Sequence, residues 1–231
     1  MTLIYVIVFS LAGLLIGWFR PRRWSTDILL ALSVLSIFWL QPLTPIRNLD
    51  FWLPTTSIGL TVVVWAITYP GKNRDFRKAA PGLAILFLTI LAIAAMRYLG
   101  PLCCLTPSKP PPMHSVVYLA GIVIILGLTI FKLSHGRRLV ILGIIGLIAL
   151  FMILKTEQLS LWASQWLRSL FGQPPEMADY TDLSWVGFSF IAFRLLHVCL
   201  DRLANRLPEY SLSEFAVFTL FFPAFLAGPI D

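Results

Sequence analysis

The feature that most constrains this chain is a succession of apolar runs, each close to the roughly 20 residues that a helix needs to cross a bilayer. Because a bilayer core offers no water to unpaired peptide groups, such runs fold as helices or form closed barrels. The composition agrees with helices, since 58% of the 231 residues are hydrophobic and only 13% are charged. We therefore expect an all-α integral membrane protein, a bundle of about eight transmembrane or broken helices, with runs at 2–19, 28–40 (extended back through Trp24), 51–69, 82–96, 115–131, 139–154, 185–200 and 215–230.

The charge of the chain is basic, with 18 Lys plus Arg against 11 Asp plus Glu. These basic residues lie in short gaps between the apolar runs and form no patch interleaved with aromatic residues, so nucleic acid is not an expected partner. The lipid bilayer is the expected partner.

Basic residues near short loops stay on the cytoplasmic side of a membrane, so their positions predict orientation. The gaps after the first, third and fifth runs hold ten basic residues, whereas those after the second and fourth hold only Arg47, Arg97 and Lys109. We therefore expect a multi-pass protein of the plasma (bacterial inner) membrane with an extracytoplasmic N-terminus. The first run has no basic residues before it and resembles an uncleaved anchor rather than a signal peptide.

The chain divides into three regions: six spans over 1–154, an extracytoplasmic interval over 155–184, and a final region over 185–231. The interval starts with a helical pattern in which Leu159, Trp162, Trp166, Leu167 and Leu170 recur every three or four residues. One interpretation is an amphipathic helix lying in the membrane interface, where Trp is enriched. The other is a helix packed on the transmembrane bundle. The pattern leaves both open.

The seventh run carries a polar stripe of Arg194, His197, Asp201 and Asn205, spaced three, four and four residues apart. At this spacing the four fall near one face of a helix, and His197 and Asp201 can touch. Exposing such a stripe to lipid would cost free energy, because charged side chains are disfavoured in the bilayer core. It is either a structural ion pair near the cytoplasmic end or the lining of a substrate path.

The eighth run combines a helix start with two helix-breaking points. Ser211 and Glu214 have the spacing of a capping box, which predicts a helix from Leu212 to Phe222. Pro223 would then interrupt this helix, and Gly228 and Pro229 would break it again. A simple proline kink is one interpretation, and the wall of a polar cavity is the other.

Other kinds of site are not indicated by the sequence. The three cysteines include the adjacent pair Cys103 and Cys104, and they form no metal-binding or disulfide framework. We expect no metal site and no bound cofactor. The sequence lacks a GxSxG elbow, an HExxH pair and a glycine-rich phosphate loop.

Two motifs in the last fifty residues resemble the signature region of the membrane-bound O-acyltransferases, in the branch of bacterial alginate acetylation and teichoic-acid D-alanylation proteins. The first motif is GFSFIAFRLLHVCLD, and the second ends in FFPAFLAGPID. The matching positions are Gly187, Ser189, Phe190, Phe193 and Asp201 in the first motif, and Phe221, Phe222, Pro223, Ala227, Gly228, Pro229 and Ile230 in the second.

The resemblance implies a helical fold around a membrane tunnel, walled in part by the broken eighth run. It also implies acyl transfer, with acetyl as the expected group, from a thioester donor (acetyl-CoA or an acyl carrier) to a hydroxyl of a glycan, lipid or cell-envelope polymer. The family's general-base histidine comes from a later part of the chain, and His197 is not its counterpart. No catalytic residue is therefore assigned, and Arg194, His197, Asp201, Asn205, Pro223, Gly228 and Pro229 are candidate tunnel or motif residues.

We expect the chain to be the front part of such an enzyme, inactive alone, whose partners are a downstream C-terminal half or other envelope-modification proteins. The alternative is a non-catalytic membrane scaffold or a transporter-like protein. A transporter of that kind predicts internal repeats, and no earlier segment mirrors the last two runs.

Overall fold

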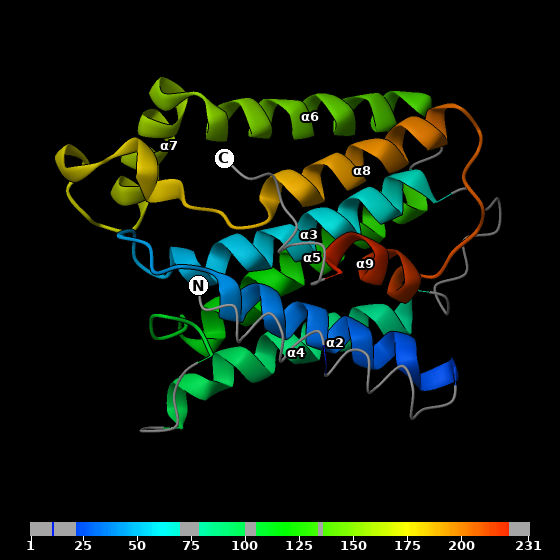
Figure 1. The fold of residues 1–231 in the computed structure, drawn as a ribbon, viewed down its shortest axis with the longest axis horizontal. Coiled ribbons are helices and arrows are strands. Elements are labelled where there is room, and N and C mark those ends of the chain that lie inside the picture. Colours follow the sequence, from blue (N-terminus) through cyan, green and yellow to red (C-terminus); the bar gives the residue numbers. More distant parts are fainter. Residues whose placement is uncertain (1–10, 12–21, 70–78, 100–104, 134–135, 222–231) are drawn as a thin grey trace.

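A computed structural model of the 231-residue chain describes residues 11, 22–69, 79–99, 105–133 and 136–221. Over these residues the chain is all helical, without a strand, as the apolar runs predict (Figure 1). The α-helices are α2 (Arg22–Leu40), α3 (Leu49–Thr68), α4 (Ala80–Ala95), α5 (Met113–Leu133), α6 (Arg137–Lys155), α7 (Glu157–Leu170), α8 (Phe188–Leu203) and α9 (Leu212–Leu220), with 3₁₀ turns η2 (Met96–Tyr98), η4 (Pro175–Met177) and η5 (Tyr180–Leu183).

The run at 2–19 lies outside the described residues except for Leu11, and so does the part of the last run from 222 to 230. The other seven runs each overlap one of the helices. The helix expected to reach Phe222 is shorter than predicted, because α9 ends at Leu220 and Phe221 leaves the helical region with a ψ of 108°. Helices commonly end at or before the residue that precedes a proline. The chain here turns away ahead of Pro223.

Within the described residues, four helices are long and apolar enough to cross a membrane: Leu49–Thr68, Ala80–Tyr98, Met113–Phe131 and Arg137–Lys155. The apolar part of α2, Thr26–Leu40, is shorter. Large apolar side chains project outward from α5 and α6, among them Ile122, Ile125, Leu142 and Ile145. In a membrane helix such a face contacts lipid, so the structure agrees with an all-α membrane bundle.

Helix α3 occupies the centre of the bundle. It contacts α2, α5, α6, α8 and α9 (Figure 1). Of the residues in its most apolar stretch 67% are buried, against 11% in the corresponding stretch of α6. Its buried hydroxyl groups create no unpaired donors, because Ser57, Thr61 and Thr68 each donate to the carbonyl oxygen one turn earlier. A central helix can therefore carry these polar residues at little cost.

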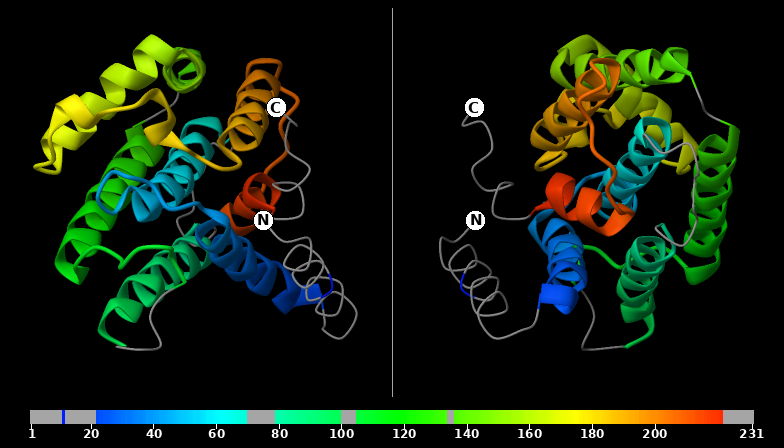
Figure 2. Two further views of the ribbon diagram at one scale, coloured as in Figure 1. Left: turned by 60° about the vertical axis from the view of Figure 1, so that its left-hand side comes forward. Right: turned by 90° about the vertical axis from the view of Figure 1, so that its right-hand side faces the viewer.

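Helix α9 packs among α2, α3 and α4, and α8 lies between α6 and α9 (Figure 2). The close approach of α4 and α9 depends on Gly82, since a Cβ atom there would lie 2.9 Å from the Ser213 backbone nitrogen. On the other side of α3, the Trp65 and Phe131 rings stack with centroids 5.0 Å apart and join α3 to α5. Buried residues of the two last helices, among them Ile191 and Leu195 of α8 and Leu212 of α9, belong to the main core.

Candidate functional site

Helix α8 carries the predicted polar stripe, and its first residue is set by Gly187. This glycine is the N-cap of α8 and has a φ of 71°, in the left-handed region that favours glycine. Ile191, Leu195 and Cys199 form the buried face of α8. The first glycine of the GFSF motif thus has a conformational role at the turn into the helix.

The His197 and Asp201 side chains meet as their spacing predicts, with Nε2 of His197 3.2 Å from Oδ2 of Asp201. They lie toward the surface of the described residues, since the His197 side chain is 71% exposed and that of Asp201 is 33% exposed. The pair is therefore accessible to a further segment or to a ligand.

Arg194 connects α8 to the last turn of α9. Its Nη1 donates a hydrogen bond to the Phe218 carbonyl oxygen. Its guanidinium lies over two aromatic rings, 4.2 Å from the Phe190 centroid and 5.1 Å from that of Phe218. The stripe is thereby fixed beside the start of the FFPAFLAGPID motif. Pro223, Gly228 and Pro229 themselves lie outside the described residues.

Asn205 ends α8 instead of continuing the stripe. It has a φ of 56°, its backbone N–H donates to the Arg202 carbonyl, and the Arg206 N–H donates to the Asp201 carbonyl. This is a Schellman termination, in which Asn tolerates the left-handed position. Asn205 also lines a hollow of about 240 Å³ with Arg137 and Arg202, whose two guanidinium groups suit an anion.

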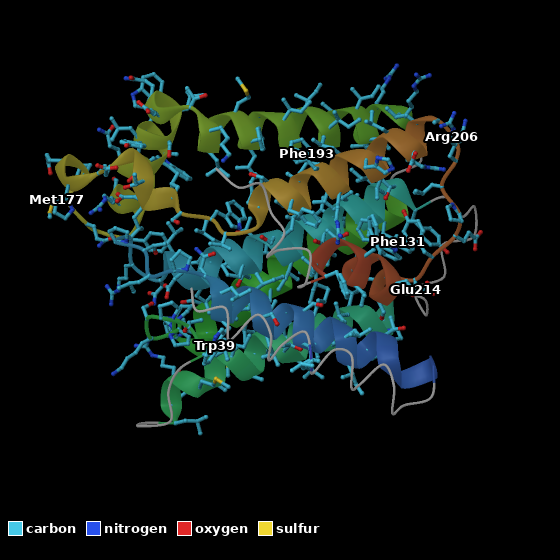
Figure 3. The ribbon with its side chains drawn as sticks, viewed as in Figure 1. Trp39, Phe131, Met177, Phe193, Arg206 and Glu214 are labelled. Carbon is cyan, nitrogen blue, oxygen red and sulfur yellow. The ribbon has the colours of Figure 1, made fainter. Side chains whose placement is uncertain are left out.

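The predicted capping box at the start of α9 is confirmed. The Ser211 Oγ accepts from the Glu214 N–H at 3.3 Å, and the Glu214 carboxylate accepts from the Ser211 N–H at 2.8 Å. Figure 3 shows Glu214 at this end of α9, beyond the loop that follows Arg206. The box fixes where α9 begins, and hence where its last turn meets Arg194.

The interval after α6 contains an ion pair that sequence reasoning missed. Arg168 on α7 donates from Nε to Oδ2 of Asp182 in η5 at 2.8 Å, and Ser164 Oγ donates to the same oxygen at 2.6 Å. Burial acts to raise the pKa of Asp182, but hydrogen bonds from Arg168, Ser164 and the Asp179 N–H, with the Arg168 charge, hold the pKa below its ordinary value. The 14-residue separation gave no local signal of this contact.

The ion pair lies on the buried side of α7. The residues that α7 buries are polar, Ser160, Ser164 and Arg168, whereas Trp162 and Trp166 are more than 60% exposed. Leu167 instead packs on a small core cluster with Leu49 and Leu53. The exposed Trp edge favours the interfacial interpretation, since Trp is enriched at membrane interfaces.

The described residues hold no group of three His, Cys, Asp or Glu side chains that could bind a metal ion. Among known proteins, no family model matches the chain, and no solved structure matches it. A stretch of 49 residues is 39% identical to a teichoic acid D-alanyltransferase from Streptococcus thermophilus. This stretch covers 21% of the chain and 12% of the relative, far less than two thirds of its length. The similarity supports a relationship to acyltransferases and does not single out a branch.

Proposed function

We propose that this chain is the N-terminal portion of a membrane-bound O-acyltransferase of the bacterial plasma membrane. It would act in transferring an acyl group, with acetyl as the expected group, to a hydroxyl of a glycan, lipid or cell-envelope polymer. The observation that carries the proposal is the 49-residue similarity to a teichoic acid D-alanyltransferase. Its setting in a lipid-facing helical bundle supports the same function.

In this proposal α8 and α9 form part of the wall of the acyl-transfer path. Arg194 holds the end of α9 against α8, and the accessible Asp201 holds His197 at the open side of the same helix. A histidine from a later segment would accept the proton of the acceptor hydroxyl, for which a pKa near neutrality is suited. The hydroxyl oxygen then bonds to the thioester carbonyl carbon, the C–S bond breaks, and the thiolate takes up a proton.

The donor is a thioester, acetyl-CoA or an acyl carrier protein, and both carry phosphate groups. The hollow lined by Arg137, Arg202 and Asn205 offers the cationic groups that bind phosphate. It lies where α6 begins and α8 ends. We propose this end of the bundle as the side from which the donor arrives.

The test is coexpression of the 231-residue chain with the polypeptide encoded directly downstream, followed by purification and assay with radiolabelled acetyl-CoA. We expect no transfer by the chain alone, and transfer by a stable complex with a histidine-bearing partner. Asp201→Asn should reduce complex yield and activity, because it removes the charge that faces His197. Glu157→Gln, which alters an exposed acid on α7, should have no effect. Transfer by the purified chain alone would contradict the proposed division of the enzyme.

A non-catalytic scaffold is the second candidate, and one observation favours it. Arg194 already bonds to the Phe218 carbonyl, and the Asn205 N–H bonds to the Arg202 carbonyl. On that hypothesis the stripe is internal packing. The chain alone would then be monodisperse and thermally stable, and its melting temperature would not respond to Asp201→Asn. Neither result is expected if the chain forms only part of a tunnel wall, because its exposed surface would then need a partner.

A further inference from the structure

One hollow is lined by the three basic residues that lie in the gaps after the second and fourth apolar runs, Arg47, Arg97 and Lys109. The hollow has a volume of about 960 Å³ and lies where α3 and α5 begin and α4 ends. Its walls come from the segments before α3 and before α5, from η2 and from the end of α7. Three cations separated by up to 62 residues in sequence therefore share one solvent-open space.

Hydrogen bonds fix the segment that carries Lys109. The Asn48 side chain donates to the Lys109 carbonyl at 2.7 Å, and Arg97 Nη1 donates to the Pro110 carbonyl at 2.5 Å. The Ser108 N–H and hydroxyl both donate to the Asp50 carboxylate, at 2.8 and 2.7 Å. The hollow is thus a built part of the fold.

The same contacts leave the hollow positively charged. Asp50 is only 1% exposed and does not line the hollow, and its carboxylate accepts hydrogen bonds from Ser108. Within the described part of the chain, the lining includes three cations and no carboxylate, and neither Arg47 nor Lys109 forms an ion pair. Guanidinium and ammonium groups in this arrangement suit the oxygens of a phosphate.

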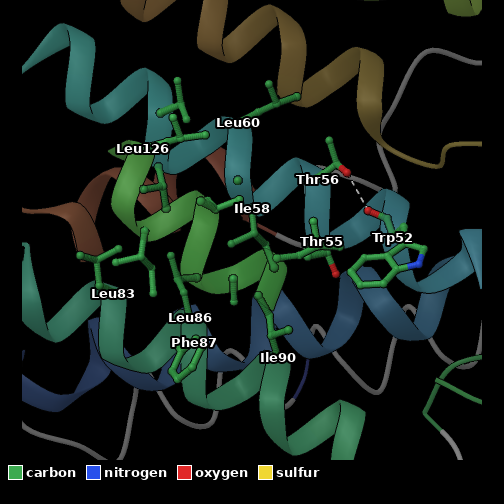
Figure 4. A pocket seen from close by; sticks show the side chains of 17 residues that line it. Trp52, Thr55, Thr56, Ile58, Leu60, Leu83, Leu86, Phe87, Ile90 and Leu126 are labelled. Carbon is green, nitrogen blue, oxygen red and sulfur yellow. Dashed lines mark hydrogen bonds between the residues drawn. The ribbon is translucent and has the colours of Figure 1, made fainter. Parts of the chain in front are cut away.

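An apolar groove of about 280 Å³ lies between α3, α4 and α5 and adjoins the hollow. Figure 4 shows the side chains that line this groove. The hollow and the groove share Trp52, Thr56 and Leu119. The hydroxyls of Thr55 and Thr56 donate to the Phe51 and Trp52 carbonyls at 2.8 Å, so they offer the groove little unmet hydrogen-bonding capacity. The groove is suited to a hydrocarbon chain.

We propose that the hollow and the groove together bind one anionic glycerophospholipid. Its phosphate lies among Arg47, Arg97 and Lys109, and one acyl chain lies along the groove between α3, α4 and α5. The excess of cations favours a lipid with net negative charge over a zwitterionic one. The continuous apolar groove favours a lipid over a free phosphate. This inference does not depend on the proposed acyl transfer.

The first experiment is native mass spectrometry of the full chain, delipidated in detergent and then titrated with a synthetic phosphatidylglycerol or phosphatidylcholine of identical acyl chains. We expect one phosphatidylglycerol to be retained per chain, and phosphatidylcholine to bind about tenfold more weakly. Glycerol 3-phosphate at the same concentration should not displace the bound phosphatidylglycerol. Equal binding of the two lipids, or displacement by glycerol 3-phosphate, would overturn the proposal, in the second case in favour of a free-phosphate site.

Two variants test separately the binding of the lipid headgroup in the hollow and the binding of the acyl chain in the groove. Arg47→Gln with Lys109→Gln should weaken phosphatidylglycerol retention about 30-fold, since two surface cations together add about 2 kcal/mol to the attraction. The control, Arg138→Gln with Arg206→Gln, makes the same change in charge at exposed residues outside the hollow and should retain the lipid. Figure 3 shows Arg206 at the far end of α8.

The second variant, Ala120→Phe, places a ring in the groove and should reduce retention of both lipids, whereas Ile122→Phe on the outward face of α5 should not. Circular dichroism and gel filtration establish that each variant is folded. Retention by the folded Arg47/Lys109 variant equal to that of the unmodified chain would refute the site.

Discussion

At the scale of single residues, the buried Arg168–Asp182 pair is the contact with the largest expected effect on stability. Asp182 accepts from Arg168 and from Ser164, and both charged side chains are buried. Asp182→Asn leaves a buried guanidinium without its counter-charge, so we expect a loss of about 2 to 4 kcal/mol in the local stability of α7 and η5. Amide hydrogen exchange over 157–184 measures it. Glu176→Gln, an exposed acid of the same interval, should leave the exchange unchanged.

The same carboxylate predicts a dependence on pH. Because the folded-state pKa of Asp182 is lowered, its ionised form stabilises the fold fully above the unfolded-state pKa of about 4. That contribution is lost as the pH falls through the folded-state pKa. The protection factors of the α7 amides, which correct for the slower intrinsic exchange at low pH, should therefore fall between pH 5 and pH 3, around the unfolded-state midpoint of about pH 4. The Asp182→Asn variant should lack this fall in protection, and an identical response in the two proteins would contradict the assignment.

At the scale of elements, the short helix α9 depends on the absence of a side chain at Gly82. An added Cβ would meet the Ser213 backbone nitrogen at 2.9 Å and the Leu212 side chain at 3.1 Å, and backbone cannot give way as a flexible side chain can. Gly82→Ala should cost about 1 to 3 kcal/mol and lower the melting temperature in detergent. Gly146→Ala, with no atom within 4 Å of the added methyl group, should keep or raise it.

Helix α7 shows why an amphipathic pattern does not by itself define a buried face. Among its apolar residues, Leu167 packs on a small cluster, whereas Trp162 and Trp166 remain exposed. The polar residues Ser164 and Arg168 turn inward because Asp182 supplies a partner for both. Leaving the arginine unpaired in that position would cost more than exposing the rings, particularly if a membrane interface covers them.

At the scale of the whole molecule, the basic residues predict opposite sides of the membrane for the two ends of α5. Lys109 precedes this helix and Arg138 follows it. In a chain whose native cysteines are replaced by serine, Lys109→Cys should react with an impermeant maleimide from outside intact cells. Arg138→Cys should react only after permeabilisation. Labelling of both from one side would contradict the predicted extracytoplasmic N-terminus.

The lengths and positions of most helices followed from the sequence, because the bilayer requires long apolar segments whose peptide groups bond within one helix. The Ser211–Glu214 cap and the His197–Asp201 contact were also predictable, since both join residues three or four positions apart. The observed end of α9, Leu220, lies two residues before the predicted end, Phe222, because the residue that precedes a proline is disfavoured in the helical region.

The sequence by itself determined that this protein is a helical membrane bundle, and it placed Arg194, His197 and Asp201 on one helix. Only the tertiary structure decided that Arg194 reaches α9, that Arg168 pairs with Asp182, and that Arg47, Arg97 and Lys109 line one hollow. The physical reason is the range of the interactions. Local contacts are set by the helical repeat, whereas contacts across 14 to 62 residues depend on how whole helices pack, which no periodicity in the sequence records.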